Sequence, residues 1–157
     1  MSANAPAAAE ALRQFRVIFG AVRQHFQAVE KACGVSGAQI WAMAALRQTP
    51  GLRVSELAQA LSIHASTASN LLDKIEKSGL VRRERNSTDQ RVVRLYLTPA
   101  GEQALEKAPQ PLTGILTHAL GQLPDDALAR LNQDLATLIA HMGAVNTRYA
   151  QKPLSEL

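Results

Sequence analysis

The chain has 157 residues, of which 46% are hydrophobic and 19% charged, and it carries a formal net charge of +4. This length and composition predict one globular domain with a core of ordinary size. No apolar run approaches the roughly 18 residues that a membrane span needs, and residues 1–9 lack the pattern of a secretory signal. The single cysteine cannot form an internal disulfide, which fits a reducing compartment. We therefore expect a cytoplasmic protein without membrane contact.

The N-terminal segment predicts a long helix, because its apolar residues alternate spacings of three and four, as in a coiled-coil seam. This first seam consists of Leu12, Phe15, Phe19, Val22, Phe26, Val29 and Cys33. A turn at residues 34–37 follows the helix. Ser36 and Gln39 then form a capping-box pattern for a second helix from about Gly37 to Gln48.

Residues 52–98 predict two short helices and a hairpin. The first helix runs from about Val54 to Leu61, and the second from about Ala65 to Ser78, where Gly79 stops it. Apolar residues of the second helix recur on one face, whereas the other face carries small hydrogen-bonding side chains that suit base edges and phosphates. The polar face comprises Ser66, Thr67, Ser69, Asn70 and Lys74.

The hairpin that follows concentrates the positive charge of the chain. Five arginines and two acidic residues lie between Arg82 and Arg94, a local net charge of +3, so the rest of the chain contributes only +1. The returning strand places Val93, Leu95 and Leu97 on one face, as in a half-buried strand.

The C-terminal part predicts two more helices. Thr98 caps a fifth helix that runs toward Leu120, and Pro109 and Pro111 interrupt it with a kink or a short break. This interruption is either a hinge or a bend that follows the molecular shape. A last helix begins at residues 124–126 and carries a second seam, which consists of Leu128, Leu131, Leu135, Leu138, Met142 and Val145. The two seams either pack on their own domain or form the interface of a homodimer. We expect the homodimer, because the seams are wider than one domain covers.

Several short motifs of this chain resemble the MarR family of bacterial transcriptional regulators. The motifs are Glu76-Lys77-Ser78-Gly79-Leu80-Val81, Asp89-Gln90-Arg91 and Leu97-Thr98-Pro99-Ala100-Gly101. The resemblance extends from about residue 8 to 146. It implies a mainly α-helical winged helix-turn-helix, with about six helices, a two- to three-stranded wing and intertwined terminal helices of a homodimer. It also implies a repressor on a pseudo-palindromic double-stranded DNA operator, released by a small molecule or an oxidant.

The expected organisation comprises a dimerisation helix (1–33), the winged helix-turn-helix (36–98), C-terminal helices that complete the dimerisation region (99–146) and a tail (147–157). The resemblance places Arg91 in the minor groove and implies that Asp89 holds the Arg91 guanidinium by a charge-assisted pair. Two residues depart from the family pattern, because Arg53 and His64 stand where small helix caps are usual. Each either adds a phosphate contact or simply caps more weakly. The expected DNA-binding residues are Ser66, Thr67, Ser69, Asn70, Lys74, Arg82, Arg85, Asp89 and Arg91.

The sensing function has two candidates. In the family the effector pocket lies where the first, second and fifth helices meet, which here implies His25 and Trp41 around a small aromatic acid, unless the pair is ordinary packing. Cys33, with Lys31 and the turn at Gly34 nearby, is the candidate for redox sensing, although its place in the first seam favours a buried and inert thiol.

The sequence contains no pattern that indicates catalysis or metal binding. The four histidines, at positions 25, 64, 118 and 141, show no short ligand spacing, and no catalytic or phosphate-loop motif is present. We expect no enzyme activity, no cofactor and no metal. The alternative of another class is a winged-helix module that binds proteins and not DNA.

Overall fold

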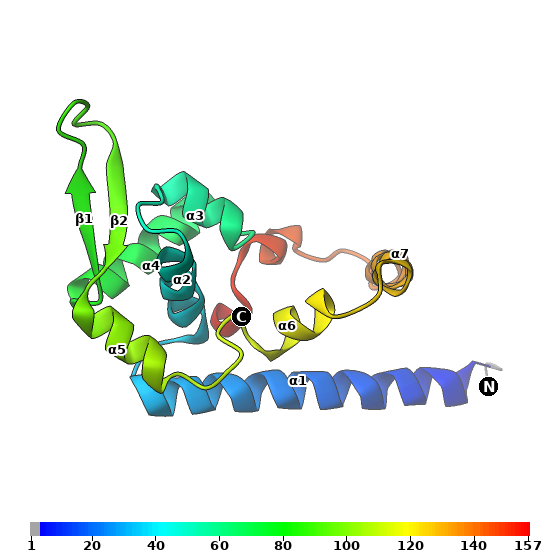
Figure 1. The fold of residues 1–157 in the computed structure, drawn as a ribbon. Coiled ribbons are helices and arrows are strands. Elements are labelled where there is room, and N and C mark those ends of the chain that lie inside the picture. The colour runs from blue at the N-terminus through cyan, green and yellow to red at the C-terminus, as the bar shows by residue number, and fades with distance from the viewer. Residues whose placement is uncertain (1–3) are drawn as a thin grey trace.

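A long N-terminal helix forms one side of the molecule, and a two-stranded hairpin projects from the opposite side (Figure 1). This computed structural model describes residues 4–157. The elements follow in chain order: α1 Ala5–Cys33, α2 Gly37–Gln48, α3 Val54–Ala60, α4 Ala65–Lys77, β1 Val81–Arg85, β2 Val93–Leu97, α5 Pro99–Lys107, α6 Ile115–Gly121, α7 Asp125–His141, and the 3-10 helices η1 Thr147–Gln151 and η2 Leu154–Glu156. The mainly α-helical winged fold is therefore confirmed.

The helix-turn-helix and the wing form as the sequence predicts. Helix α4 ends at Lys77, and Gly79 adopts a left-handed φ of 73° that glycine tolerates without a steric penalty. The strands are antiparallel, with Val81 opposite Leu97. An isolated bridge joins Leu52 to Leu95, so the wing has two strands and the trace of a third.

The core lies where α2 packs against α4 and β2. The side chains of Met43, Leu72 and Leu95 are completely buried there. Truncating such a side chain to alanine typically costs about 2–5 kcal/mol of stability. The predicted capping box of α2 is present, because Ser36 Oγ accepts the Gln39 backbone N–H at 3.2 Å and Gln39 Oε1 accepts that of Ser36 at 3.0 Å. The core thus fixes α4 and the wing as one unit.

The start of α5 packs tightly against residues 79–80, which join α4 to the wing. Thr98 caps α5 by accepting the backbone N–H of Gly101 at 3.2 Å, and its hydroxyl donates to the Gly79 carbonyl at 2.6 Å. A Cβ added to Gly101 would lie 2.2 Å from the carbonyl oxygen of Leu80. No side chain fits at position 101 without displacing backbone.

The fifth helix divides into two, which is the short break and not the kink that the sequence left open. Helix α5 ends at Lys107, and α6 begins only at Ile115, so residues 108–114 form a connection and not a kink within one helix. Pro109 and Pro111 lie inside this connection, and each lacks the N–H that a continuing helix would use. The division gives seven α-helices within residues 4–157, where the sequence predicts about six.

Both predicted seams stay largely exposed within a single chain. Phe19 of α1 is 67% exposed and Met142, just after α7, is 65% exposed, whereas Val29 near the end of α1 is buried. No residue of α7 is buried. Intrachain packing therefore covers only the C-terminal part of the first seam.

The C-terminal segment is more ordered than the tail expected from the sequence. Its two short helices, η1 and η2, return to the body of the molecule beside α2 and α4 (Figure 1). Pro153 between them is buried. This part of the chain, expected as a tail at 147–157, therefore contacts elements that lie far away in the sequence.

Candidate nucleic-acid interface

The polar face of α4 stands outside the core, where a partner can reach it. Ser66, Asn70 and Lys74 are exposed, and Thr67 and Ser69 are half-buried. The opposite face of the same helix buries Ala68, Leu71, Leu72 and Ile75. The helix therefore presents the hydrogen-bonding side chains that the sequence assigns to DNA.

His64 caps the first turn of α4. Its Nδ1 accepts the backbone N–H of Ser66 at 3.3 Å and lies 2.8 Å from the Ser66 hydroxyl. The imidazole thus takes the place of the smaller cap that the family pattern uses, because a ring nitrogen satisfies one of the free N–H groups of the helix start.

At the start of α3, Glu56 forms one half of a capping box. Its carboxylate accepts the backbone N–H of Arg53 at 2.8 Å and lies 3.5 Å from the Arg53 guanidinium. The backbone hydrogen bond from Arg53 lowers the pKa of Glu56, because it favours the charged form, and the nearby Arg53 and Arg94 guanidinium groups act in the same direction. The two family departures therefore have local structural partners.

The wing arginines divide into engaged and free groups. Arg82 pairs with Glu84 and lies over the Tyr96 ring, and Arg83 pairs with Asp73 and Glu76 of α4. Arg85 donates to the Gln90 carbonyl at 2.9 Å, and Arg94 donates to the Gly51 carbonyl at 3.0 Å. The guanidinium of Arg91 has no hydrogen bond or ion pair within residues 4–157. Arg91 is therefore the wing arginine that is fully available to a partner.

The expected pairing of Asp89 with the Arg91 side chain is not what the structure contains. Asp89 Oδ1 accepts the backbone N–H of Arg91 at 3.0 Å, and no ion pair joins the two side chains in the described part of the chain. An aspartate commonly bonds the backbone two residues ahead in a turn. Asp89 thus shapes the wing tip and leaves the guanidinium free.

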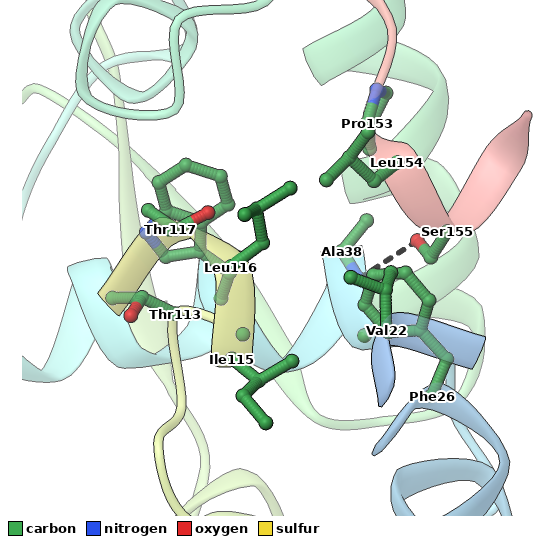
Figure 2. A pocket seen from close by; sticks show the side chains of 13 residues that line it. Val22, Phe26, Ala38, Thr113, Ile115, Leu116, Thr117, Pro153, Leu154 and Ser155 are labelled. Atoms are coloured by element: carbon green, nitrogen blue, oxygen red, sulfur yellow. Dashed lines mark hydrogen bonds between the residues drawn. The ribbon is translucent and has the colours of Figure 1, made fainter. Parts of the chain in front are cut away.

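A small cavity lies where α1, α2 and α6 meet, in the region that the sequence assigns to an effector (Figure 2). Its volume is about 30 Å³. Trp41 lines it, as expected, but His25 does not. The helix position next to His25, Phe26, lines the cavity instead, and Pro153 and Leu154 of the C-terminal segment close it.

Cys33 is half-buried, and its thiol lies 3.5 Å from the Ala104 carbonyl oxygen. Burial raises the pKa of the Cys33 thiol, which the Lys107 ammonium of α5 only partly opposes. The positive group that acts on it is therefore on α5, and is not the expected Lys31. A raised thiol pKa lowers the fraction of reactive thiolate.

Sequence reasoning missed the residues of the C-terminal segment that border α4. Arg148, Gln151 and Lys152 line a groove together with Ser66 and Thr67. The signal available in the sequence was the spacing of the two basic residues, four apart, just before Pro153 and Leu154.

In residues 4–157 no three metal-ligating side chains gather at one point, and no helix there is both long and apolar enough to cross a bilayer.

Comparison with known proteins finds similarity to one family. The MarR family model matches residues 35–93. The transcriptional repressor MdtR of Bacillus subtilis is 30% identical over 95 residues, which cover 60% of this chain and 61% of MdtR. A putative transcriptional regulatory protein for the hcr operon of Thauera aromatica is 31% identical over 57% of this chain and 54% of that protein. The chain thus spans less than two thirds of these two relatives.

Solved structures agree over more of the chain. A MarR family protein from Bacillus stearothermophilus has 25% identity and a TM-score of 0.53, with 91% of this chain and all of that chain covered. The S. aureus MepR–DNA complex has 22% identity and a TM-score of 0.57, with 82% and 94% covered, and supports the fold alone. The motifs, the winged fold and these matches together make the chain similar to the MarR family of transcriptional regulators, whose model covers residues 35–93.

Proposed function

We propose that this protein binds specific double-stranded DNA as a transcriptional repressor, an activity that belongs in the cytoplasm. The observation that carries the proposal is the combination of an exposed polar face on α4 with a free arginine, Arg91, at the tip of the wing. A helix of this kind reads base edges in a major groove, and an unpaired arginine suits the negative potential of a narrow minor groove. The name of MdtR as a repressor supports the direction of regulation.

The active form in this proposal is a homodimer with the exposed seams of α1 and α7 at its interface. Apolar side chains as exposed as Phe19 and Met142 are unfavourable in water, and burial stabilises each by roughly 1.5–3 kcal/mol. A two-fold dimer binds a pseudo-palindromic operator whose half-site centres are about 34–36 Å apart. The same interface would support the division into dimerisation and DNA-binding regions that the sequence suggests.

Phe19→Glu tests this dimer by light scattering, because a charge in the seam should yield monomers. Gln24→Glu is the matched control, since Gln24 is exposed on the same helix but outside the seam. A dimer that survives the Phe19 variant would remove the α1 seam from the interface.

The cavity beside Trp41 is the proposed site of a small aromatic effector. Aromatic and aliphatic side chains line it, but about 30 Å³ holds no more than a water molecule, whereas drug-sized ligands occupy roughly 300–1,000 Å³. An effector therefore has to displace the segment of Pro153 and Leu154. A thermal-shift screen of aromatic acids with wild type and Trp41→Ala tests this, because a bound ligand raises the melting temperature of wild type only.

Redox sensing by Cys33 is the weaker alternative, since the thiol is partly buried and its pKa is raised. Peroxide treatment of wild type and Cys33→Ser should leave DNA binding unchanged in both proteins. Release of DNA from wild type alone would restore Cys33 as the sensor.

A gel shift on the DNA upstream of the encoding gene, at several salt concentrations, tests the DNA-binding function itself. Specific binding that weakens steeply with salt is expected, because each phosphate contact releases counterions. Salt-independent binding, or none at any concentration, would favour a protein-interaction module.

A further inference from the structure

The first turn of α4 and the helix η1 enclose an open groove that contains basic and neutral side chains. Its lining residues are His64, Ser66, Thr67, Thr147, Arg148, Gln151 and Lys152. None of them is acidic. Because two of the seven belong to the polar face of α4, the groove is continuous with the surface that the proposed function assigns to DNA.

The C-terminal segment is anchored to the body of the protein at Gln151 and at Ser155. The backbone N–H of His64 donates to the Gln151 carbonyl at 3.3 Å, and that of Ala38 donates to Ser155 Oγ at 3.1 Å. Pro153 is buried between these two contacts, and Figure 2 shows Ser155 bonded to Ala38. Residues 151–155 are therefore held in a defined position relative to α4.

The two basic side chains of this segment are uncompensated. Arg148 and Lys152 are exposed, and neither has an ion pair within residues 4–157. The Lys152 ammonium lies 5.8 Å from the centre of the Tyr149 ring, a contact that leaves its charge in place. Asn146 Oδ1 accepts the backbone N–H of Arg148 at 3.1 Å and so caps η1. Two positive charges thus stand beside the Ser66 and Thr67 hydroxyls.

We propose that Arg148 and Lys152 extend the DNA interface beyond the winged helix-turn-helix, by contacting backbone phosphates beside the start of α4. This inference rests on the proposed function, since it concerns the same DNA surface. The groove is open and its charged groups are exposed, which suits a phosphate on a duplex that already lies against α4. Contacts of this kind fix the position of the protein on DNA and carry no base information. They therefore strengthen binding to every sequence alike.

Fluorescence anisotropy over a range of salt concentrations tests the proposal, with the full chain and both the upstream DNA and an unrelated duplex. For Arg148→Ala and for Lys152→Ala, we expect the slope of log K against log salt to fall in magnitude by about 0.9 per lost contact. The affinity for both duplexes should fall by the same factor. Arg148→Lys keeps the charge and should keep the slope.

Lys31→Ala is the matched control, because Lys31 is an exposed basic residue of α1 outside the groove and should leave the slope unchanged. Unchanged slopes for both Arg148→Ala and Lys152→Ala, together with weakened binding of Arg91→Ala, would overturn this inference and leave the proposed function standing. Wild-type binding without salt dependence would instead overturn the proposed function.

Discussion

The guanidinium of Arg83, in the first strand of the wing, lies 2.5 Å from Asp73 Oδ1 in α4. The same guanidinium pairs with Glu76, one turn further along the helix. A planar group with several donors suits such a double contact. The pairing joins the wing to α4, so it helps to hold the angle between the two parts that the proposed function places in adjacent grooves.

Arg83→Ala should therefore weaken DNA binding, although Arg83 itself faces α4. We expect a stability loss of only about 0.5–1 kcal/mol, since the pairs are partly exposed and screened by solvent. Thermal denaturation and anisotropy measure the two effects. Arg130→Ala is the control, because its ion pair with Asp126 is also exposed but lies on α7. Equal effects of the two variants on DNA affinity would contradict a role of Arg83 in orienting the wing.

Arg91→Ala and Asn70→Ala should differ in the kind of binding that they lose. The Arg91 side chain is free at the wing tip, and the proposed function places it in the minor groove, so its loss should lower affinity across many sequences. Asn70 is exposed on the polar face of α4, where an amide can bond one base, so its loss should relax specificity at one operator position. Binding titrations on a set of single-position operator variants separate these outcomes. A uniform loss for Asn70→Ala would refute its assignment to a base.

Glu56 should make part of the stability depend on pH. The Arg53 backbone hydrogen bond places the pKa of Glu56 below its ordinary value, so folding favours the ionised form. This contribution is fully present above the unfolded pKa, about 4.3, and is lost as the pH falls through the lower folded pKa. Melting temperatures between pH 7 and pH 3 should show wild type above Glu56→Gln at neutral pH and convergence in acid. A constant difference over the whole range would show that the carboxylate charge contributes nothing.

Gly101→Ala should destabilise the protein by about 1–3 kcal/mol, because the new methyl group would meet the Leu80 carbonyl at 2.2 Å and displace backbone. Gly121→Ala is the matched control. Gly121 is also a helical glycine, but a Cβ there meets nothing within 4 Å, so the substitution should be neutral or stabilising by a few tenths of a kcal/mol. Denaturant unfolding measures both, and equal stabilities would contradict the close approach of α5.

The helices and the wing could be predicted because their signals are local. Caps such as Ser36 and Thr98, the stop at Gly79 and the apolar spacing of α4 each act within a few residues. The division of the fifth helix could be predicted only in part, since Pro109 and Pro111 indicate an interruption but do not fix its length.

The partners of the charged groups could not be predicted in the same way. Which arginine is free depends on the strand register and on the distance from β1 to α4, neither of which a charge count contains. The cavity lining shows the same limit, because one residue along α1 decides between His25 and Phe26. The anchoring of Pro153 depends on α2 and α4, which lie far away in the sequence.

Residues 151–155 contact the start of α4 at Gln151 and line the small cavity beside Trp41 at Pro153, Leu154 and Ser155. If the proposed effector displaces Leu154 and DNA contacts Lys152, as we propose, both act on the same short backbone segment, and their binding is antagonistic. Thermodynamic linkage makes this antagonism symmetrical. The factor by which the effector lowers the affinity for the operator equals the factor by which the operator lowers the affinity for the effector. Protein that is already bound to its operator would accordingly bind the effector only at a higher effector concentration than the free protein does.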